Sequence, residues 1–126
     1  MLGLFYGLVL SKFVLSLHSG VSDHLTLHNL SRFAHAALSQ GHEIPCIFLY
    51  QDGVYHASQS LQLASDELNV SAIWQSLSNE GISLILCVTA AEKRGIDTKN
   101  TGIFKVAGLA EFAMLSAQSD KWVQFK

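Results

Sequence analysis

The sequence is poor in charge, in proline and in cysteine, and each shortage excludes a class of protein. Charged residues make up 14% of the 126 residues, the net charge is −2 and no basic run occurs, so direct binding to nucleic acid is not indicated. A single proline and the lack of repeats or low-complexity tracts argue against a linker. Only two cysteines occur, without a C-x-x-C pair, which excludes a disulfide framework and favours a reducing, cytoplasmic compartment.

Motifs for nucleotides and metals are missing as well. Neither G-x-G-x-x-G nor G-x-x-x-x-G-K-[ST] occurs anywhere in the chain. His24 and His28 are spaced i, i+4, which puts two imidazoles on one helix face, but the glutamate of H-E-x-x-H is absent. We therefore interpret the six histidines as surface or loop residues and expect neither a metal nor a cofactor.

The apolar start of the chain has two interpretations. It resembles a signal or membrane anchor, but no positive charge precedes it and Lys12 interrupts it. The uninterrupted run of about ten residues is too short to span a bilayer. We favour an apolar extension of undefined role over residues 1–11, a single domain over 12–126, and no membrane segment.

Apolar runs alternate with helical patterns through this domain, which predicts an α/β fold. We expect strands at 12–18, 44–50, 83–88 and 121–125, and helices at 24–39, 66–81, 89–94 and 108–120. Residues 51–60 are predicted as a loop with a short helical piece after it, and 95–108 as irregular. In the last helix, Leu109, Phe112 and Leu115 are expected on or near one side. Right-handed βαβ units then give a three-layer α/β/α domain around a mainly parallel sheet of about five strands.

The two cysteines fall at opposite edges of this sheet. Ligands of open parallel sheets bind beyond the carboxyl ends of the strands. Cys46 begins its strand and is interpreted as a small buried hydrophobe, whereas Cys87 ends its strand and directly precedes a helix whose amides favour a thiolate. Position alone leaves Cys87 open between a core and a functional role. A separation of roughly 13 Å along the strands excludes a disulfide between the two thiols.

Several established cysteine mechanisms do not fit Cys87. A phosphatase or rhodanese-like loop needs an arginine where Lys93 stands, and Arg94 is one place too far. Thioredoxin chemistry lacks its second cysteine. A cysteine–histidine pair stays open, because His18 and His56 fall at the same sheet edge but the sequence does not fix their distance to the thiol.

Three motifs resemble the DsrE-like sulfurtransferase family, over residue 12 to the end. In the family, a strand that ends in F-Y is followed by an acidic residue and then by G-V-Y-x-A. The matching residues here are Phe48, Tyr50, Asp52, Gly53, Val54, Tyr55 and Ala57. A later strand of the family ends in a cysteine, which leads into V-x-A-A-x-x-R-G. The matching residues here are Cys87, Val88, Ala90, Ala91, Arg94 and Gly95. Its terminal V-Q-F is matched by Val123, Gln124 and Phe125.

The resemblance implies that Cys87 carries sulfur as a persulfide, without a metal or cofactor. It also implies a hetero-hexamer with two homologous subunits, an upstream and a downstream sulfur-carrier protein, and 2-thiouridine at the tRNA wobble position as the end product. The subunit would contact carrier proteins and not tRNA. Two alternatives stay open: a subunit of a sulfur-oxidation complex, and a non-catalytic assembly subunit. Sulfur transfer requires an accessible thiolate, and a distant, buried Cys46 protects the persulfide from resolution.

Overall fold

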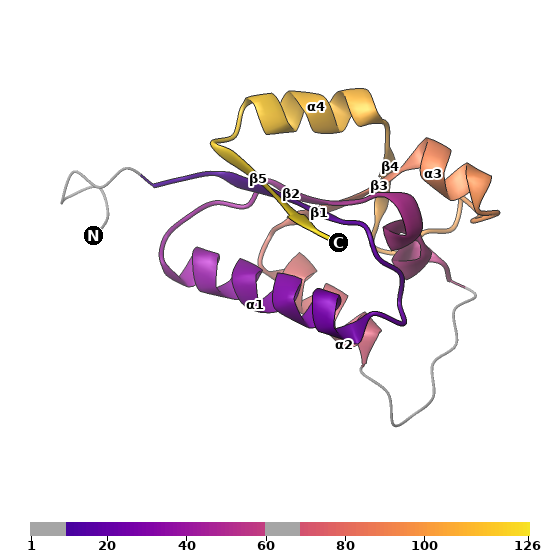
Figure 1. The fold of residues 1–126 in the computed structure, drawn as a ribbon, viewed down its shortest axis with the longest axis horizontal. Coiled ribbons are helices and arrows are strands. Elements are labelled where there is room, and N and C mark those ends of the chain that lie inside the picture. Colours follow the sequence, from indigo (N-terminus) through magenta and orange to yellow (C-terminus); the bar gives the residue numbers. More distant parts are fainter. Residues whose placement is uncertain (1–9, 60–68) are drawn as a thin grey trace.

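The computed structural model describes residues 10–59 and 69–126 as alternating strands and helices (Figure 1). In chain order the elements are β1 (Phe13–Leu17), α1 (His24–Ser39), β2 (Cys46–Leu49), the 3₁₀ helix η2 (Gln51–Ala57), α2 (Val70–Asn79), β3 (Ser83–Cys87), α3 (Val88–Lys93), β4 (Lys105–Ala107), α4 (Leu109–Ala117) and β5 (Lys121–Phe125).

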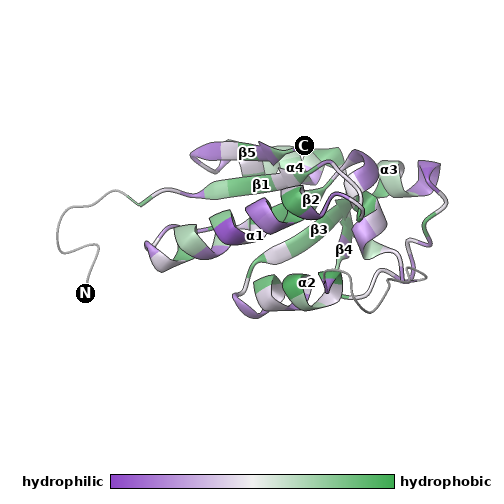
Figure 2. Cartoon of the chain, turned by 60° about the horizontal axis from the view of Figure 1, so that its bottom comes forward, coloured by the Kyte–Doolittle hydropathy of each residue, from purple (hydrophilic) through white to green (hydrophobic). Residues whose placement is uncertain are grey.

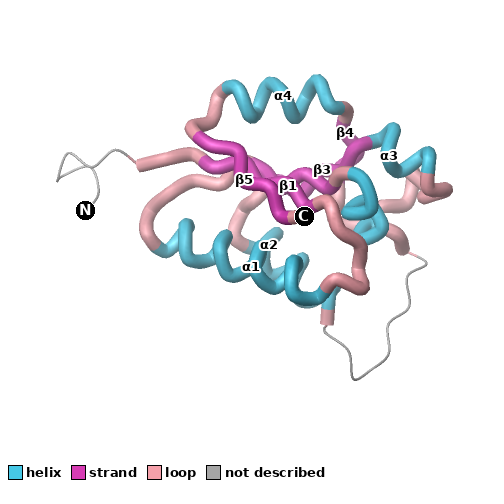
Figure 3. Tube along the Cα trace, in the orientation of Figure 1, coloured by secondary structure: helices cyan, strands magenta, loops and turns pink. Residues whose placement is uncertain are grey.

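The strands form one parallel sheet in the order β4-β3-β2-β1-β5. Helices α1 and α2 lie on one face and α4 on the other, so the sheet is the middle of three layers (Figure 3). The short helix α3 continues from the carboxyl end of β3. The predicted three-layer α/β/α architecture with about five parallel strands is confirmed.

Local sequence signals set the limits of α1 where the sequence predicted them. The Asp23 carboxylate accepts a hydrogen bond from the Thr26 amide at 3.1 Å and another from its hydroxyl at 2.7 Å. These bonds cap the helix and lower the pKa of Asp23, because they stabilise its charged form. After the helix, Gly41 has a φ of +90°, a left-handed conformation that ends the helical run at little cost to glycine.

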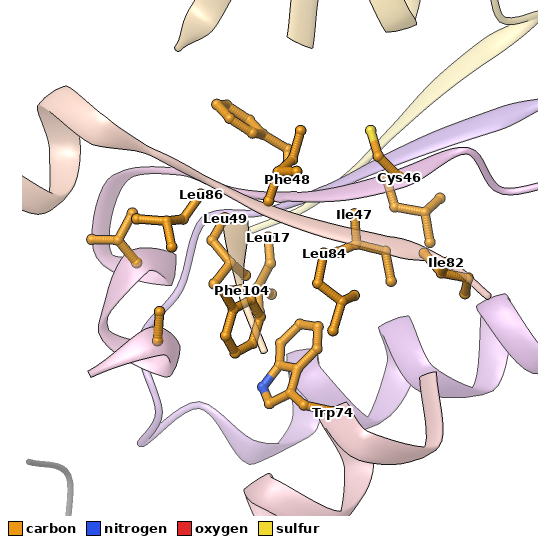
Figure 4. Close-up of a cluster of buried hydrophobic side chains, with 14 of the residues drawn as sticks. Leu17, Cys46, Ile47, Phe48, Leu49, Trp74, Ile82, Leu84, Leu86 and Phe104 are labelled. Carbon is orange, nitrogen blue, oxygen red and sulfur yellow. The ribbon is translucent and has the colours of Figure 1, made fainter. Parts of the chain in front are cut away.

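The core lies on both faces of the central strands, which explains why their sequences are continuously apolar. Every residue of β2 is buried, and Figure 2 shows the hydrophobic colour of β2 and β3. In Figure 4, Cys46 and Phe48 lie on one side of the strands, and Trp74 and Phe104 on the other. Phe48 stacks on Phe112 of α4 at a ring distance of 4.5 Å. Trp74 of α2 meets Phe104 edge-on at 5.1 Å.

Two segments predicted as irregular contain regular structure. Residues 51–57 form η2 instead of a loop, because Gly53 lets the chain fold tightly against the end of β1; a Cβ at Gly53 would collide with the Leu17 carbonyl. The stretch 95–108 contains β4, a three-residue strand that reads K-V-A and has no apolar alternation to reveal it.

Helices α2 and α4 also differ in part from the prediction. The start predicted for α2 falls partly on residues 66–68, outside the described residues, and the described helix begins at Val70. In α4, Phe112 is buried and Leu115 packs against the core, whereas Leu109 is 51% exposed. Leu109 is the first residue of α4 and follows the end of β4 by one residue, Gly108.

The predicted extension over 1–11 lies mostly outside the described residues, which begin at residue 10. Ser11 already contacts the domain, because its amide donates to His42 Nδ1 at 3.1 Å and its carbonyl accepts from the Glu43 amide. Among the helices that the structure describes, none is long and apolar enough to cross a bilayer.

Candidate functional site

Cys87 is the last residue of β3 and the N-cap of α3, at the carboxyl edge of the sheet. Its strand neighbour on the outer side is Ala107 of β4. A cavity of about 300 Å³ opens beside it and is lined by Tyr50, Gln51, Cys87, Thr89, Ala90, Lys93, Arg94 and Leu109. None of these lining residues is acidic, and two are cationic.

Cys87 lines this cavity but is itself buried and not on the surface. Cys87 is only 1% exposed, so the expectation of a freely accessible thiol is wrong for the described chain. The cause is that β3 is covered on both faces up to its last residue. A reaction partner can reach the thiol only through the cavity that Cys87 lines.

The two cations that follow Cys87 in the sequence, Lys93 and Arg94, both line the cavity. Arg94 is held in place, because its Nε donates to Asp52 Oδ1 at 2.8 Å and its Nη1 donates to the Ala90 carbonyl at 3.1 Å. Lys93 is exposed at the end of α3. Lys93 thus gives the cavity a positive charge that favours anionic sulfur, whereas the charge of Arg94 is largely offset by Asp52.

Cys46 has a different environment at the opposite edge. It pairs with Ser83, four residues before Cys87 on the same strand, and no disulfide joins the two cysteines. Cys46 is fully buried, as predicted, and burial raises the pKa of its thiol to about 12, with a smaller contribution from the negative charge of Glu111. This thiol is a core residue that stays protonated at neutral pH.

The two candidate histidines are both outside the lining of the Cys87 cavity. His18 hydrogen-bonds to Ser16 Oγ at 2.8 Å and to Gln51 Oε1 at 3.0 Å. His56 is buried and lines another cavity of about 330 Å³; its Nδ1 accepts a hydrogen bond from Trp74 Nε1 at 3.3 Å. A direct cysteine–histidine pair is therefore not formed in this structure.

Burial gives His56 the character of a neutral core residue. Desolvation lowers the pKa of His56 to about 4, although the backbone of Ser19 and Gly20 lies close enough to oppose the shift slightly. Its Nε2 is buried and has no hydrogen-bond partner among the described residues. The ring thus stays uncharged at neutral pH.

Sequence reasoning missed four residues that line the cavity: Tyr50, Gln51, Thr89 and Leu109. Tyr50 and Gln51 directly follow β2, the strand beside β3, so both lie at the carboxyl edge. That position was a usable signal, because neighbouring parallel strands end at the same edge. The backbone of Gln51 gave no sequence signal: its φ is +51°, the one positive value among the described non-glycine residues.

The described part of the chain contains no group of three His, Cys, Asp or Glu side chains placed to hold a metal ion. His24 and His28 are both on α1, which lies on the face of the sheet away from α4. The chemistry available at the carboxyl edge is therefore that of a thiol, two cations, an amide and two hydroxyls.

A family model, curated proteins and solved structures all match this chain. The model of the DsrE/DsrF-like family matches residues 12–125. Curated proteins named Sulfurtransferase TusD match over 107 residues, 75% of this chain and 84% of theirs, with 38% identity for Salmonella typhi and 36% for Enterobacter sp. (strain 638). Among solved structures, the ychN protein from E. coli superposes with a TM-score of 0.74 at 22% identity, covering 93% of this chain and all of that chain. At this identity the structural likeness shows the fold alone.

Proposed function

Since the chain belongs to the DsrE/DsrF-like family, we propose that it is a sulfur-relay subunit that carries persulfide sulfur on Cys87. The family predicted from the sequence motifs is confirmed, and the name of the curated relatives supports the predicted sulfurtransferase class. In this proposal an upstream carrier protein donates the sulfur and a downstream carrier protein receives it. The subunit acts in a hetero-hexamer with two homologous subunits, and the relay ends in 2-thiouridine at the tRNA wobble position.

The reaction needs one thiolate and transfers one sulfur atom in each half. The Cys87 thiolate attacks the terminal sulfur of the donor persulfide, R–S–SH, so that a new S–S bond forms and the donor's S–S bond breaks. The donor leaves as the thiolate R–S⁻ with the electron pair, and Cys87–S–SH remains. In the second half, the acceptor thiolate attacks Cys87–S–SH at its terminal sulfur, and the Cys87 thiolate is regenerated. Neither half needs an external oxidant, reductant, metal or cofactor.

The observation that supports this proposal best is the pairing of Cys87 with a cationic cavity. Every species on the path contains a sulfur anion, as the attacking or as the leaving thiolate. Lys93 stabilises such anions in the cavity that Cys87 lines, and Arg94 lines the same cavity while paired with Asp52. The absence of a second thiol at this edge also favours a persulfide over a disulfide, since Cys46 is sealed at the opposite edge.

A non-catalytic assembly subunit is the second candidate, and the burial of Cys87 favours it. A thiol that is 1% exposed in the isolated chain is accessible to a carrier only through the cavity. If homologous subunits cover that opening, Cys87 is a core residue and the subunit contributes surface alone. Alkylation of the assembled complex separates the two candidates, because resistance of Cys87 supports the assembly role and ready modification supports the relay role.

The direct test is intact-mass measurement of the purified complex after incubation with a persulfidated carrier protein. We expect the wild-type subunit to gain the mass of one sulfur atom, which a thiol reductant then removes. Cys87→Ser should gain nothing, whereas the matched control Cys46→Ser should gain the full sulfur. The same mass gain in Cys87→Ser would refute the proposal.

A further inference from the structure

A chain of hydrogen bonds runs from the edge strand β5 across β1 to the wall of the Cys87 cavity. Trp122 Nε1 donates to Ser16 Oγ at 2.8 Å, and Ser16 Oγ lies 2.8 Å from His18 Nε2. His18 Nδ1 then lies 3.0 Å from Gln51 Oε1, and Gln51 lines the cavity together with Cys87. The chain thus connects a buried serine to a side chain beside the proposed reaction site.

The order of donors and acceptors in this chain fixes the tautomer of His18. The indole N–H of Trp122 only donates, so Ser16 Oγ accepts from it and has its own proton left to donate. Ser16 is fully buried, and among the described residues His18 Nε2 is the acceptor within reach of that proton. His18 Nε2 is therefore unprotonated, and its Nδ1–H donates to Gln51 Oε1.

This donation also fixes the orientation of the Gln51 amide. Its oxygen is turned toward His18, so its two N–H donors are on the other side of the carboxamide. The backbone supports the same placement: the φ of +51° is a left-handed conformation that glutamine adopts at a cost of about 1 kcal/mol or more. Hydrogen bonds from the Tyr50 amide to the Leu17 carbonyl and from the Gly53 amide to the Tyr50 carbonyl hold the turn in this shape.

We propose that the Gln51 amide N–H donates a hydrogen bond to the sulfur anion in the cavity, and that His18 is a positioning residue that acts through Gln51. The inference rests on the proposed function, because the anion is the Cys87 thiolate or the thiolate that leaves the donor persulfide. His18 then acts on the sulfur through two successive hydrogen bonds, from His18 to Gln51 and from Gln51 to the sulfur, and not as a direct partner of Cys87. It also explains why a cavity with two cations includes an uncharged amide held in a left-handed conformation.

The first test is spectroscopic and does not depend on sulfur transfer. Heteronuclear NMR of the ¹⁵N-labelled imidazoles at neutral pH reports which nitrogen of each histidine carries the proton, and His18→Asn assigns the His18 signals. We expect His18 in the Nδ1–H form. A predominant Nε2–H form would overturn the inference, since the Gln51 oxygen would then have no donor at His18.

The second test compares isosteric charge changes at two glutamines. Gln51→Glu replaces the donor by an anion, whereas Gln75→Glu makes the same change on α2, away from the Cys87 cavity. We expect Gln51→Glu to slow two reactions of Cys87 about tenfold or more, namely sulfur uptake from a small persulfide and alkylation by neutral iodoacetamide. Gln75→Glu should match the wild type. Equal rates in the two variants, at unchanged circular dichroism, would overturn the inference.

The role of His18 is tested by a matched pair of replacements. Asparagine retains a donor near the position of Nδ1, whereas leucine does not. We expect His18→Leu to slow both reactions about threefold and His18→Asn to restore most of that loss. Equal slowing by both replacements would indicate a merely structural role and overturn the assignment.

The two readouts separate this inference from the proposed function. If the wild type takes up no sulfur while Gln51→Glu still slows alkylation, the relay proposal fails and the amide–thiolate contact stands. If the wild type takes up sulfur and Gln51→Glu has no effect on either reaction, the amide contact alone fails. If Cys87 of the wild type resists alkylation altogether, the cavity does not open onto the sulfur and both fail.

Discussion

The two cysteines are alike in burial and differ in almost everything else. They lie on neighbouring parallel strands, on the same face of the sheet, because Cys46 pairs with Ser83 and Cys87 follows four residues later. Both are almost completely buried, and both lie on the side that α4 covers: Glu111 contributes to the raised pKa of Cys46, and Leu109 lines the cavity of Cys87. The difference is position along the strand. Ligands of open parallel sheets bind beyond the carboxyl ends of the strands, which is where Cys87 lies and Cys46 does not.

The largest expected difference between the cysteines is in reactivity. With a pKa of about 12, Cys46 should react with iodoacetamide more than about a thousandfold more slowly than free cysteine at neutral pH. Cys87 should be modified first, through its cavity. Peptide mapping by mass spectrometry after timed alkylation measures both rates in one sample, and comparable rates at the two sites would break the comparison.

The pH dependence of the free energy of unfolding tests the prediction that the buried His56 is neutral in the folded chain. The pKa of His56 falls from 6.5 in the unfolded chain to about 4 in the folded chain, so above 6.5 the ring is neutral in both states. As pH falls through the window between these values, the unfolded chain binds a proton that the folded chain does not, and stability is lost. The loss approaches about 3 kcal/mol near pH 4.

Urea unfolding at about pH 7.5 and about pH 5 measures this effect, which amounts to about 2 kcal/mol over that interval. His56→Gln retains an acceptor for Trp74 Nε1 and removes the titrating ring, so its pH dependence should be flatter by that amount. An equally steep dependence in His56→Gln would assign the loss to other groups.

Serine replacements compare the two edges in terms of stability. Cys46→Ser places a hydroxyl in the core beside apolar neighbours and should lower the free energy of unfolding by about 2 kcal/mol. Cys87→Ser places the hydroxyl against a cavity that water can enter and should cost less than about 1 kcal/mol. Equal costs from chemical denaturation would mean that the cavity is closed in solution.

The smallest expected effect concerns the cations. Lys93→Gln should slow sulfur uptake by Cys87 about fivefold, because an exposed charge contributes about 1 kcal/mol or less to a nearby anion. Lys121→Gln makes the same change at the amino end of β5 and should have no effect. The difference should shrink as salt is added, which a rate series at increasing ionic strength would show.

The sequence predicted the fold well where burial on two sides leaves a continuous apolar pattern. Strands β2 and β3 are such cases, and the contrast between Cys46 and Cys87 followed from their positions in those strands. The helix α1 was predicted equally well from its one-sided apolar spacing and its Asp23 cap. The prediction failed where a long-range contact decides the local structure. The 3₁₀ helix η2 depends on the approach of Gly53 to the Leu17 carbonyl, and β4 exists because it pairs with β3.

The candidate site was predicted only in its central residue. Cys87 could be selected because the end of a strand is visible in the sequence, but the surroundings that decide its chemistry come from other elements. Gln51 has a left-handed backbone that no residue pattern marks, and Arg94, which also lines the cavity, is held by Asp52 of η2. The burial of the thiol was left open by the sequence, because the last residue of a buried strand can face either the core or the edge.

The pairing of β5 with β1 has a consequence for how the protein is made. The first strand leaves the ribosome early, yet its outer edge is covered only by β5, with a hydrogen bond from the Lys12 amide to Asp120 across 108 residues. Until β5 is synthesised, the apolar strand β1 has an unpaired edge, which can pair with other chains and cause aggregation during translation. Expression yield should therefore depend on chaperones that shield nascent chains, and loss of the last strand should give insoluble product even though the Cys87 cavity lies elsewhere.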